Sequence, residues 1–91
     1  MAVIIRATGE YEDIEGKGEN NTLTYSQMVE AVGGYIETVP TNDGKVMILD
    51  EEGKLKSKPL NIKATKMVEG VIMADDVIVG DVIVCENSEI D

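Results

Sequence analysis

The aliphatic residues of this chain come in short runs rich in Val and Ile, and these runs constrain the fold more than any other feature. The first run is Ala2–Ala7, a central pair is Tyr35–Val39 and Lys45–Asp50, and the last is Val71–Cys85. β-Branched side chains favour strands over helices. The central pair flanks the sequence PTNDG, which predicts an antiparallel hairpin. We therefore expect a largely antiparallel sheet.

Two short helices are predicted between these strands. The first lies within Leu23–Gly34, where Thr24 and Gln27 match a capping box and Gly33 can end the helix in a left-handed conformation. The second begins after Asn61, which is a suitable N-cap residue. Each helix has one apolar face. The first has only about two turns, so tertiary packing must stabilise it.

The order strand, helix, strand, strand, helix, strand predicts one α+β domain over residues 1–91, with both helices on one face of the sheet. The core must be aliphatic, because the chain has no Phe, no Trp and only three Tyr. Residues 8–21 contain three glycines and five acids and are expected to form a mobile loop, and the acidic tail 87–91 is expected to fray. The sequence leaves open whether Gly80 and Asp81 form a hairpin turn or a bulge.

Charge and cysteine content restrict the classes of partner. The formal net charge of −10 repels the nucleic-acid backbone, so DNA and RNA are not expected partners. The single Cys excludes an intramolecular disulfide and fits a reducing, cytoplasmic location. No apolar stretch approaches the roughly 18 residues that span a membrane, and no signal peptide is expected. The oligomeric state stays open.

The chain has few means for catalysis. It contains no His, so the commonest general base and metal ligand is missing. Cys85 ends an aliphatic run, as a buried structural thiol does. Asp75, Asp76 and Asp81 could bind Mg²⁺ or form an acid–base pair, but acids this close are expected by chance in such an acidic chain. We therefore predict a non-enzymatic protein with no cofactor and no metal.

Five of the eight basic residues lie in one acid-free stretch, namely Lys54, Lys56, Lys58, Lys63 and Lys66. The alternating sequence KLKSK predicts an extended arm with three lysines on one side. The arm leads to the N-cap Asn61 and a helix start, where free N–H groups attract anions. Tyr35 could stack on a base, although packing at a strand start is the more usual role of such a Tyr. Together these residues form a predicted anion site.

Two other interpretations of the lysine stretch stay open. Alternating lysines usually protect an exposed edge strand from aggregation, and this interpretation needs no ligand. The lysines could also contact the acidic face of a second subunit. The stretch contains no Arg, which is the residue that binds phosphate in a bidentate manner.

Several short sequences in this chain resemble a known family. They are VGGYIETVP, LDEEGKLKSKPLNIKAT and DVIVGDVIV, all between Leu23 and Val84. The chain thereby resembles the family described as domain of unknown function 3846, whose members are small proteins of bacteria, phages and mobile elements. The glycine-rich segment 8–21 and the acidic tail lie outside the resemblance. It implies a compact α+β fold and a phage or prophage origin, and it assigns no activity.

The predicted function is therefore binding. The first hypothesis is an accessory protein that sequesters a small anionic, nucleotide-like ligand at the lysine stretch. The alternative is an acidic protein–protein inhibitor of a host factor, in the manner of a DNA mimic. Residues 53–66 carry a charge of +5, and the three basic and eighteen acidic residues elsewhere sum to −15.

Overall fold

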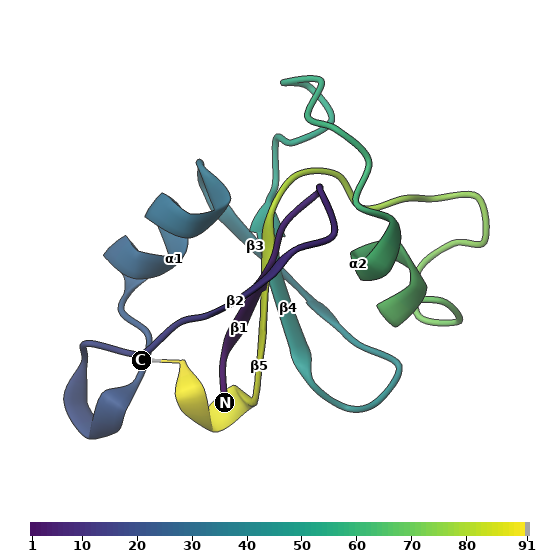
Figure 1. Cartoon of the computed structure of the whole chain (residues 1–91). Helices are drawn as coiled ribbons and strands as arrows, with labels where there is room; N and C mark the ends of the chain where they lie inside the picture. Colours follow the sequence, from purple (N-terminus) through teal and green to yellow (C-terminus); the bar gives the residue numbers. More distant parts are fainter. Residues whose placement is uncertain (91) are drawn as a thin grey trace.

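The computed structural model describes residues 1–90, and an antiparallel sheet of five strands forms its centre (Figure 1). The strands are β1 (Val3–Ile5), β2 (Tyr11–Asp13), β3 (Ile36–Pro40), β4 (Val46–Asp50) and β5 (Val82–Cys85). Their order across the sheet is β2-β1-β5-β4-β3, and every adjacent pair is antiparallel. β4 and β5 are buried at every position. The predicted α+β class and the predicted hairpin of β3 and β4 are confirmed.

Both predicted helices form, with the predicted caps. In α1 (Tyr25–Val32) the Thr24 hydroxyl accepts from the Gln27 N–H, and the Gln27 side chain accepts from the Thr24 N–H. Gly33 ends α1 at φ +81°, in the left-handed region that glycine tolerates. In α2 (Ile62–Met67) the Asn61 side chain accepts from the Ala64 N–H. Two short 3₁₀ helices complete the fold, η1 (Glu19–Asn21) and η2 (Asn87–Glu89).

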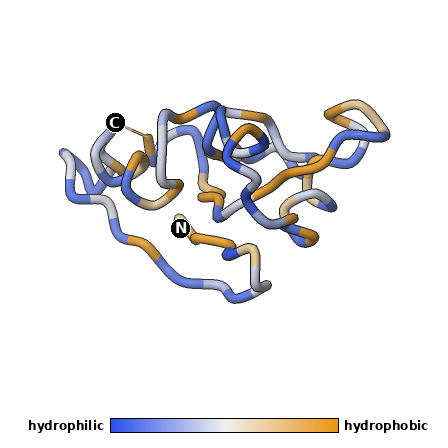
Figure 2. The backbone as a smooth tube through the Cα atoms, turned by 90° about the horizontal axis from the view of Figure 1, so that it is seen from above, coloured by the Kyte–Doolittle hydropathy of each residue, from blue (hydrophilic) through white to orange (hydrophobic). Residues whose placement is uncertain are grey.

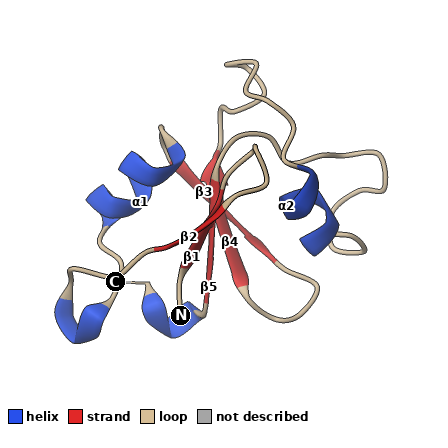
Figure 3. Cartoon of the chain, viewed as in Figure 1, coloured by secondary structure: helices blue, strands red, loops and turns tan. Residues whose placement is uncertain are grey.

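The two helices pack on opposite faces of the sheet, so the prediction that they share one face is wrong (Figure 3). Under α1 lies one apolar cluster, which includes Ile4, Met28, Val32, Ile48 and Ile83. Under α2 lies a second, which includes Ile5, Met47, Ala64, Val68 and Val82. Successive side chains of a strand point to opposite faces. Because β1, β4 and β5 are apolar at consecutive positions, both of their faces need a cover, and one helix serves each.

Residues 8–21 were expected to form a loop throughout, but they contain β2 and η1. β2 pairs with β1 in the register Val3↔Asp13 and Ile5↔Tyr11, and all three of its side chains are exposed. Figure 2 shows the contrast: the run next to the N-terminus is hydrophobic, and the stretch that returns beside it is mostly hydrophilic. Backbone pairing with β1, which side-chain patterns do not report, explains this strand. The mobility of the rest of the segment stays a prediction.

The acidic tail lies against the start of α1. The Leu23 N–H donates to the Glu89 carbonyl over 2.6 Å, and Ile90 packs against the apolar cluster under α1. Fraying of this tail stays a prediction, and Asp91 lies outside the described residues.

Gly80 and Asp81 do not form a hairpin turn. Gly80 bends the chain at φ +78°, and its N–H donates to the Pro59 carbonyl over 2.7 Å. The preceding residue, Val79, makes an isolated bridge with Leu60. The chain therefore passes directly from this bridge into β5.

Candidate functional site

The lysine stretch starts with a series of turns instead of the predicted extended arm. Turns follow β4 from residue 51 to residue 57. The N–H groups of Lys56, Ser57 and Lys58 donate to the carbonyls of Glu52, Lys54 and Gly53 over 3.0 to 3.1 Å. Ser57 takes φ +55°, which closes the last turn. The stretch also forms no edge strand, since the sheet edges are β2 and β3, so the interpretation as an edge-strand guard is wrong as well.

Asp50 draws two of the lysines inward. It is the last residue of β4, and its side chain is only 2% exposed. The Nζ atoms of Lys56 and Lys58 each lie 2.8 Å from its Oδ2, and the Glu52 N–H donates to Oδ1 over 2.9 Å. Burial alone would raise the pKa of Asp50, but the hydrogen bonds from both lysines and from Glu52 outweigh it and lower the pKa to about 2. We call the side chains of Asp50, Lys56 and Lys58 the Asp50 clasp.

The clasp also caps the C-terminal end of α1. The Lys58 Nζ donates to the Val32 carbonyl over 2.6 Å, and the Lys56 Nζ donates to the Gly33 carbonyl over 3.2 Å. α1 has no basic residue in its own last turn, so these lysines supply the positive charge that favours a helix C-terminus. A Cβ at Gly34 would lie 2.7 Å from the Asp50 carboxylate oxygens, so the close approach requires glycine there.

The other three lysines point to separate places. Lys54 pairs with Asp76 in the loop that follows α2. The Lys63 Nζ donates to the Gly9 carbonyl over 2.6 Å and lies 4.6 Å from the centre of the Tyr11 ring. Lys66 is exposed and makes no ion pair within residues 1–90. The five lysines therefore do not converge on one pocket.

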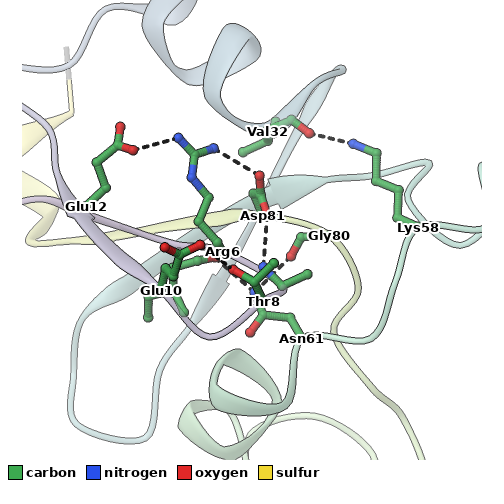
Figure 4. A network of polar contacts seen from close by, with 11 residues as sticks. Arg6, Thr8, Glu10, Glu12, Val32, Lys58, Asn61, Gly80 and Asp81 are labelled. Carbon is green, nitrogen blue, oxygen red and sulfur yellow. Dashed lines mark hydrogen bonds and ion pairs between the residues drawn. The ribbon is translucent and has the colours of Figure 1, made fainter.

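Asn61 is a buried structural residue. Its side chain is fully enclosed: its Nδ2 donates to the carbonyls of Ile5 (3.0 Å) and Gly80 (2.9 Å), and its Oδ1 accepts from the Ala64 N–H. It ties α2 to β1 and to the start of β5 (Figure 4), so every hydrogen-bonding group of this amide is used inside the protein.

Tyr35 lies at the surface, 65% exposed, beside the glycines that end α1. Its carbonyl accepts from the Glu51 N–H over 3.0 Å, which continues the β3–β4 ladder by one residue pair. Its backbone thus has a structural role, and stacking of its ring on a base stays a prediction.

Sequence reasoning missed the ion pairs of Arg6, the only arginine of the chain. Its Nη1 lies 3.0 Å from Asp81 Oδ2 and its Nη2 lies 2.9 Å from Glu12 Oε1 (Figure 4). Asp81 also accepts from the Ala7 N–H. The hydrogen bonds that Arg6 donates to Glu12 and Asp81 raise its pKa. The signal was a lone Arg at the end of a buried strand, but its partner Asp81 is 75 positions away.

A shallow groove of about 420 Å³ lies between this ion pair and the end of α1. Its lining includes Arg6, Glu30, Gly33, Lys58 and Asp81. Both cations of the groove already have anionic partners. Arg6 pairs with Glu12 and Asp81, and Lys58 pairs with Asp50. The groove therefore offers balanced charge, and a bound anion would have to compete with these carboxylates.

The family model described as Domain of unknown function (DUF3846) matches residues 1–91. The chain belongs to this family. The match extends beyond Leu23–Val84 to the whole chain, so it includes the segment 8–21 and the acidic tail. No curated protein and no solved structure matches the chain. The family description names no activity, so function has to be argued from the side chains.

Other reactive side chains of this DUF3846 protein are held in structural contacts. Cys85 is buried, and burial, reinforced by Glu89, raises its pKa to about 11, which disfavours the reactive thiolate. Asp76 and Asp81 belong to different ion pairs. Within residues 1–90 no three His, Cys, Asp or Glu residues form a group that could hold a metal ion. None of the described helices is long and apolar enough to cross a membrane.

Proposed function

We propose that this DUF3846 protein is a cytoplasmic, non-enzymatic binding module whose partner is a protein with a basic surface. The observation that carries this proposal is the pairing of three of the five lysines with carboxylates of the same chain. Lys56 and Lys58 form ion pairs with Asp50, and Lys54 forms one with Asp76. Three of the five lysines in the predicted cationic site are therefore matched by carboxylates, and only Lys63 and Lys66 form no ion pair within residues 1–90.

The acidic residues favour a basic partner. The net charge is −10, and exposed acids lie on both edges of the sheet, at Glu12 and Asp13 on β2 and at Glu37 on β3. Opposite charges steer two proteins together and speed their association. The family resemblance supports a phage or prophage origin for the chain, and in that case the partner is a host protein that the module inhibits.

Affinity capture at two salt concentrations tests the proposal. The immobilised protein is exposed to bacterial lysate at about 50 mM salt, and each retained protein is purified and titrated against the free chain at about 50 and 500 mM salt. The proposal predicts a basic partner whose affinity falls strongly at the higher salt. It fails if no protein is retained at low salt, or if the retained proteins bind equally well at both concentrations.

A second candidate is the binding of a small anion such as a nucleotide in the groove beside α1. It is favoured by one observation, namely that Arg6 and Lys58 both line this groove. Thermal unfolding with millimolar nucleotides and cyclic nucleotides tests it. This candidate predicts a higher Tm with one of them, an effect lost in Lys58→Ala and kept in Lys66→Ala. No change of Tm with any nucleotide would exclude it.

A further inference from the structure

β3 is an edge strand of the sheet. Hydrogen bonds just beyond its two ends show which of its residues pair with β4 and which face outward. The Thr41 N–H donates to the Lys45 carbonyl, and the Glu51 N–H donates to the Tyr35 carbonyl, so Tyr35 and Thr41 face β4. Backbone groups alternate in direction along a strand. The N–H and C=O groups of Ile36 and Thr38 therefore point away from the sheet, as does the C=O of Pro40. These groups can pair with an added strand.

A groove of about 190 Å³ lies beside this edge, on the face that carries α2. Apolar side chains of the sheet and of the segment before β5 line it, among them Val39, Leu49 and Ile78. Its acidic lining residues are Glu37, Glu51 and Asp76, besides Asp50, and the one lysine there, Lys54, is paired with Asp76. The groove thus combines apolar side chains with two acids, Glu37 and Glu51, that form no ion pair within residues 1–90.

The other edge offers less to an incoming strand. β2 has three residues, against five in β3, and the Lys63 ammonium lies over the ring of its Tyr11. A second copy of this chain is a poor occupant of β3, since it would bring another net charge of −10 to an acidic groove.

We propose that an extended basic segment of the partner protein adds to β3 as a sixth strand. The segment pairs with the outward groups of Ile36 and Thr38, places an apolar side chain against Val39, and sets Lys or Arg beside Glu37 and Glu51. Main-chain pairing supplies affinity in such an addition, and alternate side chains supply specificity. This inference rests on the proposed function, because it specifies where the basic partner binds.

The probe is a synthetic peptide of seven residues, Thr-Val-Thr-Lys-Thr-Lys-Thr, capped at both ends. Its Val and both Lys residues share one face of the strand, as Val39 and Glu37 share one face of β3. Titration into ¹⁵N-labelled protein should shift the amide resonances of Ile36 and Thr38 most and slow their hydrogen exchange. Thr38→Pro removes one outward N–H and leaves the bonds to β4 intact, so it should weaken binding about tenfold, whereas Thr38→Ala should not. Glu37→Gln should weaken binding about threefold, and Asp13→Asn on β2 should leave it unchanged.

The inference is overturned if the peptide does not bind at millimolar concentration, if the largest shifts fall outside β3, or if Thr38→Pro binds as Thr38→Ala does. The wild-type shifts decide the matter even if Thr38→Pro fails to fold. Failure here leaves the proposed function standing when lysate capture still yields a salt-sensitive basic partner. When capture yields none, the proposed function fails as well.

Discussion

The lysines of residues 53–66 lie close in sequence, but some reach a buried partner and others reach an exposed one. Lys56 and Lys58 reach an Asp50 side chain that is 2% exposed, whereas Lys54 reaches an Asp76 side chain that is 42% exposed. Exposed ion pairs contribute about 0 to 1 kcal/mol, and breaking a buried one costs several times more. The burial of the partner therefore decides which lysines stabilise the fold. The next three pairs of substitutions test whether burial sets the cost of losing a polar contact.

The largest effect is expected at the buried amide of Asn61. Asn61→Ala should lower the free energy of unfolding by about 4 kcal/mol, because it removes a helix cap and two buried hydrogen bonds to the carbonyls of Ile5 and Gly80. Urea unfolding followed by circular dichroism measures the loss. Asn42→Ala is the control, since the exposed Asn42 side chain donates one hydrogen bond, to the Lys66 carbonyl, and its backbone bond to Met67 is kept. The cost should stay below about 1 kcal/mol. Equal losses in the two variants would contradict the claim that burial makes the hydrogen bonds of Asn61 more stabilising than those of Asn42.

The next effect is expected at the centre of the clasp. Asp50→Asn keeps the size of the side chain and removes the charge that holds Lys56 and Lys58. We expect a loss of about 3 kcal/mol in the free energy of unfolding, because two ammonium groups lose their buried anion. Chemical unfolding of Glu51→Gln provides the comparison, since Glu51 is the exposed neighbour of Asp50 and should cost less than about 0.5 kcal/mol. If Asp50→Asn leaves the free energy of unfolding unchanged, the buried pairs of Asp50 do not stabilise the fold more than exposed pairs do.

The smallest effect separates the lysines themselves. Lys58→Met keeps the aliphatic stem but loses the contacts with Asp50 and with the Val32 carbonyl, and we expect a cost of about 1.5 kcal/mol. Lys54→Met loses only an exposed pair and should change stability by less than about 0.5 kcal/mol. Parallel unfolding curves in urea measure both variants. If Lys54→Met is as costly as Lys58→Met, burial of the partner does not decide which lysine matters.

Local signals predicted well where the interacting residues are neighbours in sequence. The caps at Thr24, Gly33 and Asn61 depend on residues three or four positions away, and all three form. The sequence also contains the signal that both faces of the sheet are covered, because the run VMILD in β4 is apolar at four consecutive positions. A strand with one solvent face alternates between apolar and polar residues instead.

Contacts between distant segments explain what sequence reasoning missed. The alternation of KLKSK predicted an extended arm, but Asp50 and the end of α1, 26 positions from Lys58, draw the side chains inward. The pair of Arg6 and Asp81 joins segments 75 positions apart. No periodicity in a single sequence reports such contacts, so the predicted anion site and the observed clasp share residues but differ in what those residues bind.

The pKa of Asp50 tests the clasp most directly. Pairing lowers it on folding from about 3.8 to about 2, so ionised Asp50 stabilises the fold by about 2 kcal/mol above pH 4. This contribution is lost as the pH falls from about 4 to about 2. Carboxyl ¹³C chemical shifts followed over this range report the titration of Asp50 in the folded protein. A carboxyl group still ionised at pH 3 is the predicted result, and a midpoint near 4, as for an exposed Asp, would contradict the clasp.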